Sequence, residues 1–191
     1  MGLNVADIYI INTCAVTNEA ERKSRNIITK LLKLNANSSI YVCGCASQNN
    51  PDNFKKCDNV KDIIGNYDKN ALVKSICKND PTENKSQTHD EARRVTDRTR
   101  AILWAQNGCN NFCTYCIVPY VRGRERSRDK SIILSEARDM ITSGYKDITL
   151  LGQNVNSYGK KLENGVNFSQ LLREIDSIEG DYWLRFMTSH P

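Results

Sequence analysis

The sequence is organised around Gly108-Cys109-Asn110-Asn111-Phe112-Cys113-Thr114-Tyr115-Cys116, which places three cysteines at the spacing C-x3-C-x2-C. Three thiolates this close along one loop can hold an iron–sulfur cube and leave one of its irons open to another ligand. A zinc knuckle is the alternative. Structural zinc usually takes four ligands from paired cysteine units, and the nearest histidines here, His89 and His190, are far away along the chain. The spacing therefore favours an iron–sulfur cluster.

The composition is compatible with this chemistry. The chain has 191 residues, enough for one or two domains, and eight cysteines with no export signal ahead of them. Such cysteine usage indicates metal or redox chemistry in a reducing cytoplasm rather than disulfides. The longest apolar stretches have the length of a strand, so no membrane partner is expected. The net charge of +5 is compatible with nucleic acid but does not require it.

Upstream of the cysteine loop, short apolar runs alternate with amphipathic stretches. We expect strands at 7–12, 39–42 and 62–64, and helices at 17–34 and 69–77, with a helical turn opened by Pro51. Strands that alternate with helices pair in parallel, so residues 1–78 are predicted to form a Rossmann-like domain of the α/β class. Cys14 and Cys45 each follow a predicted strand, where ligands collect in open α/β sheets.

Residues 79–98 are polar without apolar periodicity and are predicted to be a linker. A second series then begins, with strands at 100–106, 147–151 and 182–187 and helices at 131–142 and 168–178. This order resembles the first part of a β/α barrel over residues 99–191, with functional loops at the carboxyl ends of the strands. Trp104 and Trp183 fall within strands and are predicted to be core residues.

Beyond the spacing itself, the loop resembles the signature of the radical S-adenosylmethionine (SAM) superfamily, including the aromatic Tyr115 before the last cysteine. Four further stretches make the resemblance more specific. The run from Gly108 to Arg128 looks like the methylthiotransferase branch, and matching motifs of that branch stand at Asn12-Thr13-Cys14, Gly44-Cys45, Leu151-Gly152-Gln153-Asn154-Val155-Asn156 and Thr188-Ser189-His190-Pro191.

The resemblance implies two 4Fe–4S clusters and SAM. One cluster would be held by Cys109, Cys113 and Cys116, and its open iron would bind SAM and cleave it to a radical that abstracts hydrogen from an unactivated carbon. The second would use Cys14 and Cys45 and carry the sulfur to be methylated and transferred. The family's remaining cysteine, expected ahead of Cys14, is absent here, as are the rest of the barrel and a small RNA-binding domain. We therefore expect an internal fragment or a truncated product. Cys43 is a weak alternative as the third ligand.

Six residues are predicted to contact SAM or substrate: Tyr115, Arg122, Arg128, Gly152, Gln153 and Asn154. Arg122 to Arg128 carries an arginine at every second position, and an extended run would present these side chains on one side to phosphates. A solvated loop, with Glu125 paired to a neighbour, is the alternative. Gln and Asn at a strand end can hydrogen-bond SAM, although a plain turn between strand and helix would also explain them.

The predicted function is a tRNA methylthiotransferase that adds a 2-methylthio group to an isopentenyl-modified adenosine 3′ of the anticodon. The same reaction on threonylcarbamoyl-adenosine is the first alternative, and an inactive iron–sulfur-binding fragment is the second. A third branch, acting on a ribosomal protein, is disfavoured by the 153–156 run. Expected partners are the anticodon loop of tRNA, whose bases can be splayed into a pocket, and an electron donor such as a flavodoxin or ferredoxin.

Overall fold

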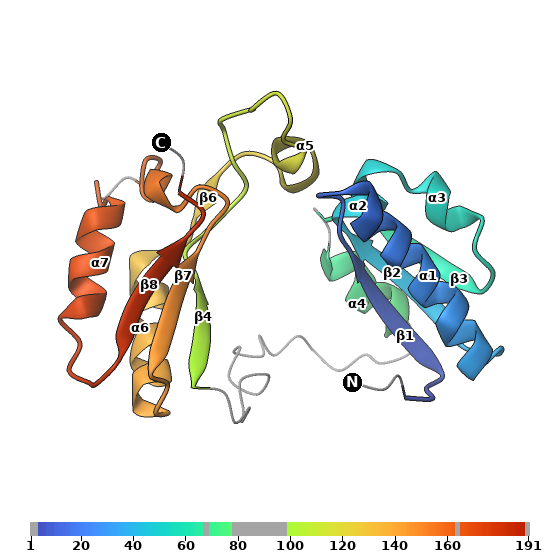
Figure 1. Ribbon diagram of the computed structural model, residues 1–191, viewed down its shortest axis with the longest axis horizontal. Helices are drawn as coiled ribbons and strands as arrows, with labels where there is room; N and C mark the ends of the chain where they lie inside the picture. The colour runs from blue at the N-terminus through green and yellow to red at the C-terminus, as the bar shows by residue number, and fades with distance from the viewer. Residues whose placement is uncertain (1–3, 67–68, 78–98, 163–164, 190–191) are drawn as a thin grey trace. The chain divides into compact units, whose positions relative to one another are not determined.

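The structure, a computed structural model, describes residues 4–66, 69–77, 99–162 and 165–189. The chain divides into two compact units (Figure 1). The N-terminal unit comprises Met1–Pro81 together with Asn111–Gly123, and the C-terminal unit comprises Thr82–Asn110 and Arg124–Pro191. The predicted linker at 79–98 lies outside the described residues.

The N-terminal unit is built on a parallel sheet in the order β1-β2-β3, with β1 at Ile8–Thr13, β2 at Ser39–Gly44 and β3 at Val60–Ile64. Its core gathers Ile28 and Leu31 of helix α1 (Asn18–Leu34) against Ile40 and Val42 of β2. Thr17 caps α1 by accepting a hydrogen bond from the backbone N–H of Ala20 at 3.1 Å. The predicted parallel α/β layer is confirmed here.

Two short helices follow β2: α2 (Cys45–Asn49) and α3 (Asp52–Lys55). The turn predicted after Pro51 is α3, whereas α2 was not predicted. Gly44 makes α2 possible, because its φ of +107° is open to glycine and strained for other residues. The chain can thus turn sharply out of β2, which places Cys45 at the first position of a helix. Helix α4 (Lys69–Ile76) contacts β2 and β3.

Residues 111–123 depart from the predicted domain boundary. They contain helix α5 (Val118–Arg122), which packs on α2 and belongs to the N-terminal unit, so the predicted domain 99–191 is divided in the structure. Pro119 and Val121 are the buried residues of α5, and Val121 has 2% of its surface exposed. The run from Arg122 to Arg128 is not extended throughout, because Arg122 ends a helix and Gly123 turns the chain with a φ of +78°.

The C-terminal unit carries a parallel sheet in the order β4-β7-β8, with β4 at Arg100–Trp104, β7 at Asp147–Leu151 and β8 at Trp183–Met187. Helices α6 (Lys130–Thr142) and α7 (Phe168–Asp176) supply the other half of its core. Leu103, Ile148, Leu150, Ile133 and Leu171 are fully buried there. The strand–helix–strand order predicted from the sequence is confirmed, with β7 beginning and ending at the predicted residues.

The prediction that Trp104 and Trp183 are core residues is wrong. Burial alternates along β4, so that Ala101 and Leu103 are buried whereas Ile102 and Trp104 are exposed. Because successive strand side chains point to opposite faces, Trp104 lies on the face away from the core. Trp183 is 71% exposed and lies beneath the guanidinium of Arg185, at 5.7 Å.

Candidate functional site

The cysteine loop begins on a two-residue antiparallel ladder. Strand β5 (Gln106–Asn107) pairs with β6 (Arg126–Ser127), so residues 108–125 form the loop of a long hairpin. Gly108 follows β5 with a φ of +79°, and its N–H donates a hydrogen bond of 2.6 Å to the side-chain oxygen of Gln153. Cys109 comes next and is buried. The cysteine loop therefore lies beside the turn that follows β7.

Cys113 and Cys116 lie in the part of the loop that belongs to the N-terminal unit. The N–H of Cys116 donates to the carbonyl oxygen of Cys113 at 2.9 Å, which closes a tight turn between the two half-buried cysteines. Tyr115 on this turn is 88% exposed. No group of three His, Cys, Asp or Glu side chains within the described ranges is arranged to hold a metal ion. The ligand role of Cys109, Cys113 and Cys116 therefore stays a prediction.

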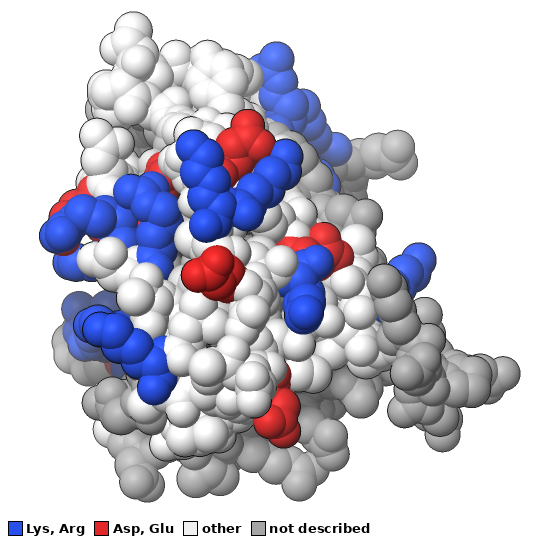
Figure 2. All heavy atoms as spheres, turned by 90° about the vertical axis from the view of Figure 1, so that its right-hand side faces the viewer, with Lys and Arg blue, Asp and Glu red and all other residues white. Residues whose placement is uncertain are grey.

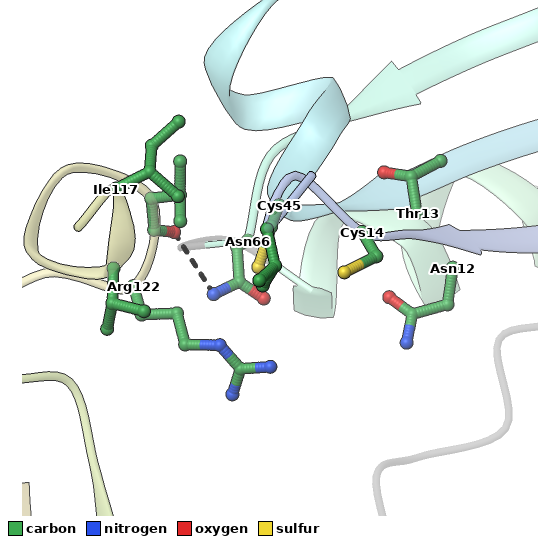
Figure 3. A pocket seen from close by; sticks show the side chains of 10 residues that line it. Asn12, Thr13, Cys14, Cys45, Asn66, Ile117 and Arg122 are labelled. Carbon is green, nitrogen blue, oxygen red and sulfur yellow. Dashed lines mark hydrogen bonds between the residues drawn. The ribbon is translucent and has the colours of Figure 1, made fainter. Parts of the chain in front are cut away.

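A pocket within the N-terminal unit brings together the two other predicted cluster ligands (Figure 3). Cys14 follows β1 and Cys45 begins α2, and both line a cavity of about 140 Å³. Thr13 holds the two strand ends together, because its hydroxyl donates to the carbonyl oxygen of Cys43 at 2.8 Å and accepts from the N–H of Ser47 at 3.1 Å. The tertiary structure thus joins two cysteines that are 31 positions apart in the sequence.

Cys43 has a different environment. It is buried in β2, and its thiol donates a weak hydrogen bond to the side-chain oxygen of Asn12 at 3.9 Å. The described residues that line the pocket include Asn12 but not Cys43. Nothing in this geometry supports Cys43 as a third ligand.

Helix α5 supplies another wall of the same pocket through Ile117, Val118, Val121 and Arg122. Asn66, which follows β3, donates from its side chain to the carbonyl oxygen of Val121 at 3.2 Å and also lines the pocket. Sequence reasoning missed Asn66, Ile117 and Val118, because the contact depends on residues 111–123 joining the N-terminal unit. The Gly65-Asn66 pair after a predicted strand was the one available signal.

The turn after β7 is shaped by close packing. A Cβ on Gly152 would lie 3.2 Å from the Cβ of Gln106 and 3.3 Å from the Cα of Val155, so this backbone sits against the end of β4 and β5. Thr188, just after β8, donates its hydroxyl to the carbonyl oxygen of Gly152, and its own carbonyl oxygen accepts from the N–H of Val155 at 2.9 Å. Two motifs that carried the family resemblance are thus hydrogen-bonded to each other.

Two side-chain oxygens beside this turn are buried and have no hydrogen-bond partner: Oε1 of Gln106 and Oδ1 of Asn154. Gln106 is 1% exposed and Asn154 is 6% exposed. Orphaned acceptors in an interior are costly unless a donor is supplied. SAM carries donors in its amino group, ribose hydroxyls and adenine amine, so the acceptors present fit that ligand. No disulfide joins any of the eight cysteines, all of which lie in the described residues, and the thiols of the predicted ligands fit a cluster that takes thiolate ligands.

The two arginines predicted to contact ligand have different surroundings. Arg122 lines the pocket of the N-terminal unit. Arg128 forms two hydrogen bonds with the carboxylate of Glu136, at 2.7 and 3.0 Å, and a third with the backbone oxygen of Trp104 at 2.8 Å. These contacts give Arg128 a structural role that the sequence did not suggest, and its predicted ligand contact stays untested.

Charge on the side of the molecule seen in Figure 2 is of mixed sign, with basic and acidic side chains interspersed. This face is therefore not uniformly basic. Ion pairs occur along helices of the N-terminal unit: Arg22 contacts Glu19 at 2.8 Å, Arg25 contacts Glu21 at 2.6 Å, and Lys55 contacts Asp52 at 2.8 Å. None of the described helices is long and apolar enough to span a bilayer.

Comparison with known proteins finds two matching regions, one on each side of the predicted linker, and the second region includes residues 111–123. Residues 2–65 match the family described as uncharacterized protein family UPF0004. Residues 105–190 match the radical SAM superfamily. A radical SAM methyltransferase from Kitasatospora setae, solved with a SAM analogue and tryptophan, has a similar fold, with a TM-score of 0.55 at 14% identity over 87% of this chain and 39% of that one.

The similar curated relatives are tRNA-2-methylthio-N(6)-dimethylallyladenosine synthases. That of Clostridium tetani is 44% identical over 98% of this chain and 45% of its own length. That of Finegoldia magna is 42% identical over 97% of this chain and 43% of its own length. The chain thus spans about half the length of the relatives that it matches. The chain therefore combines a region that matches UPF0004 with a region that matches the radical SAM superfamily, and it is similar over nearly its whole length to these synthases.

Proposed function

We propose that the chain is the cluster-binding part of a tRNA methylthiotransferase that adds a 2-methylthio group to an isopentenyl-modified adenosine next to the anticodon. The observation that carries this proposal is the hydrogen bond between Gly108 and Gln153, which ties the C-x3-C-x2-C loop to the turn with orphaned acceptors. The activity for which the relatives are named favours the dimethylallyl substrate over threonylcarbamoyl-adenosine.

In this proposal the thiolates of Cys109, Cys113 and Cys116 hold a 4Fe–4S cluster. The SAM-binding surface is formed by Gln106, Gly152 and Asn154. When bound, the cluster and SAM supply the one-electron chemistry that breaks an unactivated carbon–hydrogen bond. The protein's part is to bind and orient. Gly152 leaves the SAM-binding surface without a side chain at its position. The buried oxygens of Gln106 and Asn154 accept hydrogen bonds from SAM in a site from which water is excluded.

Cys14 and Cys45 are proposed as two thiolate ligands of a second 4Fe–4S cluster in the N-terminal pocket. Arg122 lines the same pocket, and its positive charge would stand beside the anionic thiolates of the cluster ligands. Thr13 and Asn66 hold the walls in place through the hydrogen bonds described above. The proposed substrate is the tRNA anticodon loop, and the proposed electron donor is a flavodoxin or ferredoxin. The proposed compartment is the cytoplasm.

The test begins with anaerobic reconstitution of the chain with iron and sulfide. We expect about four irons per chain for one cluster and about eight for two, and reductive formation of 5′-deoxyadenosine from SAM. Cys113→Ser should abolish SAM cleavage and remove one cluster's iron, whereas Cys77→Ser, at an exposed cysteine, should change neither. One equivalent of zinc without iron would contradict the proposal. An iron-loaded chain that leaves SAM intact would indicate an inactive iron–sulfur fragment.

The substrate is tested separately. Mass spectrometry of tRNA nucleosides from a strain that lacks the full-length gene should show loss of the 2-methylthio group from isopentenyl-adenosine. Loss from threonylcarbamoyl-adenosine instead would assign the chain to the other branch.

A further inference from the structure

Gln153 was predicted to bind SAM, but the structure gives its side-chain oxygen another partner. That oxygen accepts the N–H of Gly108 at 2.6 Å, directly before the first cysteine of the motif. Gly108 has a φ of +79°, a backbone conformation that glycine adopts readily. Because a glycine also has the most conformational freedom to lose, its orientation depends on what holds its peptide groups. Gln153 is the side chain that holds this one.

The opposite side of Cys109 is held as well. The side-chain oxygen of Asn110 accepts the N–H of Glu125 at 3.2 Å, across the base of the same hairpin loop. Glu125 is in turn fixed by its side chain, since its carboxylate accepts the hydroxyl of Ser157 at 2.7 Å. Glu125 is 6% exposed and Ser157 is 2% exposed, so this pair is interior.

The Ser157 hydroxyl connects this side of the loop to the end of β4 and β5. It accepts a hydrogen bond of 2.8 Å from the side-chain amide of Gln106. Gln106 and its neighbour in β5 pair with β6, whose residues immediately follow Glu125. The residues on both sides of Cys109 are therefore held by hydrogen bonds, through the backbone N–H of Gly108 and the side chain of Asn110. Both sets of hydrogen bonds connect to the segment that contains Gln153 and the short helix at Val155–Ser157.

We propose that Gln153 is a positioning residue for the cysteine loop: it acts through Gly108 on Cys109, and the Asn110–Glu125–Ser157 set holds the other side. This inference rests on the proposed function, in which Cys109 is a cluster ligand whose thiolate must be held in one orientation. Cluster-binding loops gain affinity when their backbone is preorganised and their outer hydrogen bonds are in place. Gln153 thus serves the loop rather than SAM.

The first test needs neither cluster nor SAM. Gln153→Met keeps the length of the side chain and removes its acceptor, whereas Gln153→Glu keeps an acceptor oxygen. In the metal-free chain, we expect amide exchange at Gly108 to be about tenfold faster in Gln153→Met and close to wild type in Gln153→Glu. Asn156→Ala, at an exposed position of the same turn, is the matched control and should leave this exchange rate unchanged.

The second test uses the reconstituted chain and compares iron release to a chelator with SAM affinity. Gln153→Met should release iron several-fold faster than wild type, because the loop that presents Cys109 loses an outer hydrogen bond. Gln153→Glu should retain iron and bind SAM within about twofold of wild type. Asn110→Ala, which loosens the other side of Cys109, should also speed iron release.

Three results would overturn the inference: unchanged Gly108 exchange in Gln153→Met, a Gln153→Glu chain that loses SAM affinity while its Gly108 exchange stays normal, or iron release unaffected by either loop variant. If Gln153→Met does not fold, as judged by circular dichroism, Gln153→Ala takes its place in the exchange measurement. A wild-type chain that binds no iron would refute the proposed function, and the exchange measurement would still decide whether Gln153 holds the loop.

Discussion

Asn66 donates a hydrogen bond from its side-chain amide to the backbone oxygen of Val121, at 3.2 Å. One partner follows strand β3 of the N-terminal sheet, and the other lies in the helix that comes directly after the last cysteine of the C-x3-C-x2-C motif. The pocket that contains Cys14 and Cys45 is lined by both of these segments. The segment that follows the motif thus forms one wall of the pocket around two distant cysteines.

Replacing Asn66 by alanine should loosen α5. The Val121 carbonyl would lose its partner, which costs about 1 kcal/mol for a neutral hydrogen bond. We expect faster amide exchange across residues 118–122 and little change in β1 and β2. Asn37→Ala, at an exposed position of the same unit, is the control. Uniform acceleration across the whole unit would show instead that Asn66 supports global stability.

Gly44→Ala should be among the most damaging single changes in the N-terminal unit. A Cβ there would lie 2.5 Å from the carbonyl oxygen of Thr13, in addition to the strain of a φ of +107°. Gly144 shares a positive φ, +84°, but a Cβ on it would meet nothing within 4 Å. We expect Gly144→Ala to cost about 1 kcal/mol and Gly44→Ala about 2–4 kcal/mol, since only the second adds a backbone clash.

Chemical denaturation of the two glycine variants measures the difference. Because Gly44 shapes the turn that leads into Cys45, its variant should also bind less iron in the N-terminal pocket. Equal destabilisation by the two substitutions would mean that the contact with Thr13 relaxes and that only backbone strain matters.

Arg128→Lys tests which role that arginine has. A lysine cannot reproduce the two hydrogen bonds to Glu136 together with the bond to the Trp104 carbonyl. If these contacts are its function, the variant should lose about 1–2 kcal/mol of stability and keep its affinity for SAM. Thermal melting and equilibrium dialysis with SAM give the two quantities. Weaker SAM binding at unchanged stability would support the predicted ligand contact instead.

Tyr158 should make the stability of the C-terminal unit sensitive to alkaline pH. Burial raises the pKa of Tyr158 from near 10 to about 12, and its hydroxyl donates to the backbone oxygen of Arg128 at 2.9 Å. A raised pKa means that the fold favours the protonated phenol. This contribution is fully present below pH 10 and is lost as the pH rises from about 10 to about 12.

Absorbance titration of the metal-free chain at alkaline pH should therefore show one tyrosine that ionises late, and Tyr158→Phe should remove that step. The variant should also show a smaller decrease in melting temperature over this pH interval. A late step that persists in Tyr158→Phe would assign it to another residue. Tyr182 is the next candidate, because burial also raises its pKa.

Much of the local structure follows from residue patterns. The helical spacing of apolar residues such as Ile28 and Leu31 was sufficient to predict α1, and the apolar run 147–151 predicted β7 to the residue. Helix α2 was not predicted, because five residues that begin at a cysteine carry too little periodicity. Trp104 was misassigned because a strand's apolar residues do not reveal which of its two faces meets a helix layer.

The sequence by itself predicted the alternation of the main strands and helices and the type of motif in the cysteine loop, because both depend on spacing between near neighbours. Only the tertiary structure decided which residues meet. It brought Cys14 and Cys45 to one pocket, joined α5 to the N-terminal unit through Asn66, and turned Gln153 toward Gly108. Such contacts link residues 31 to 55 positions apart, and they depend on strand register and helix packing that no local pattern encodes.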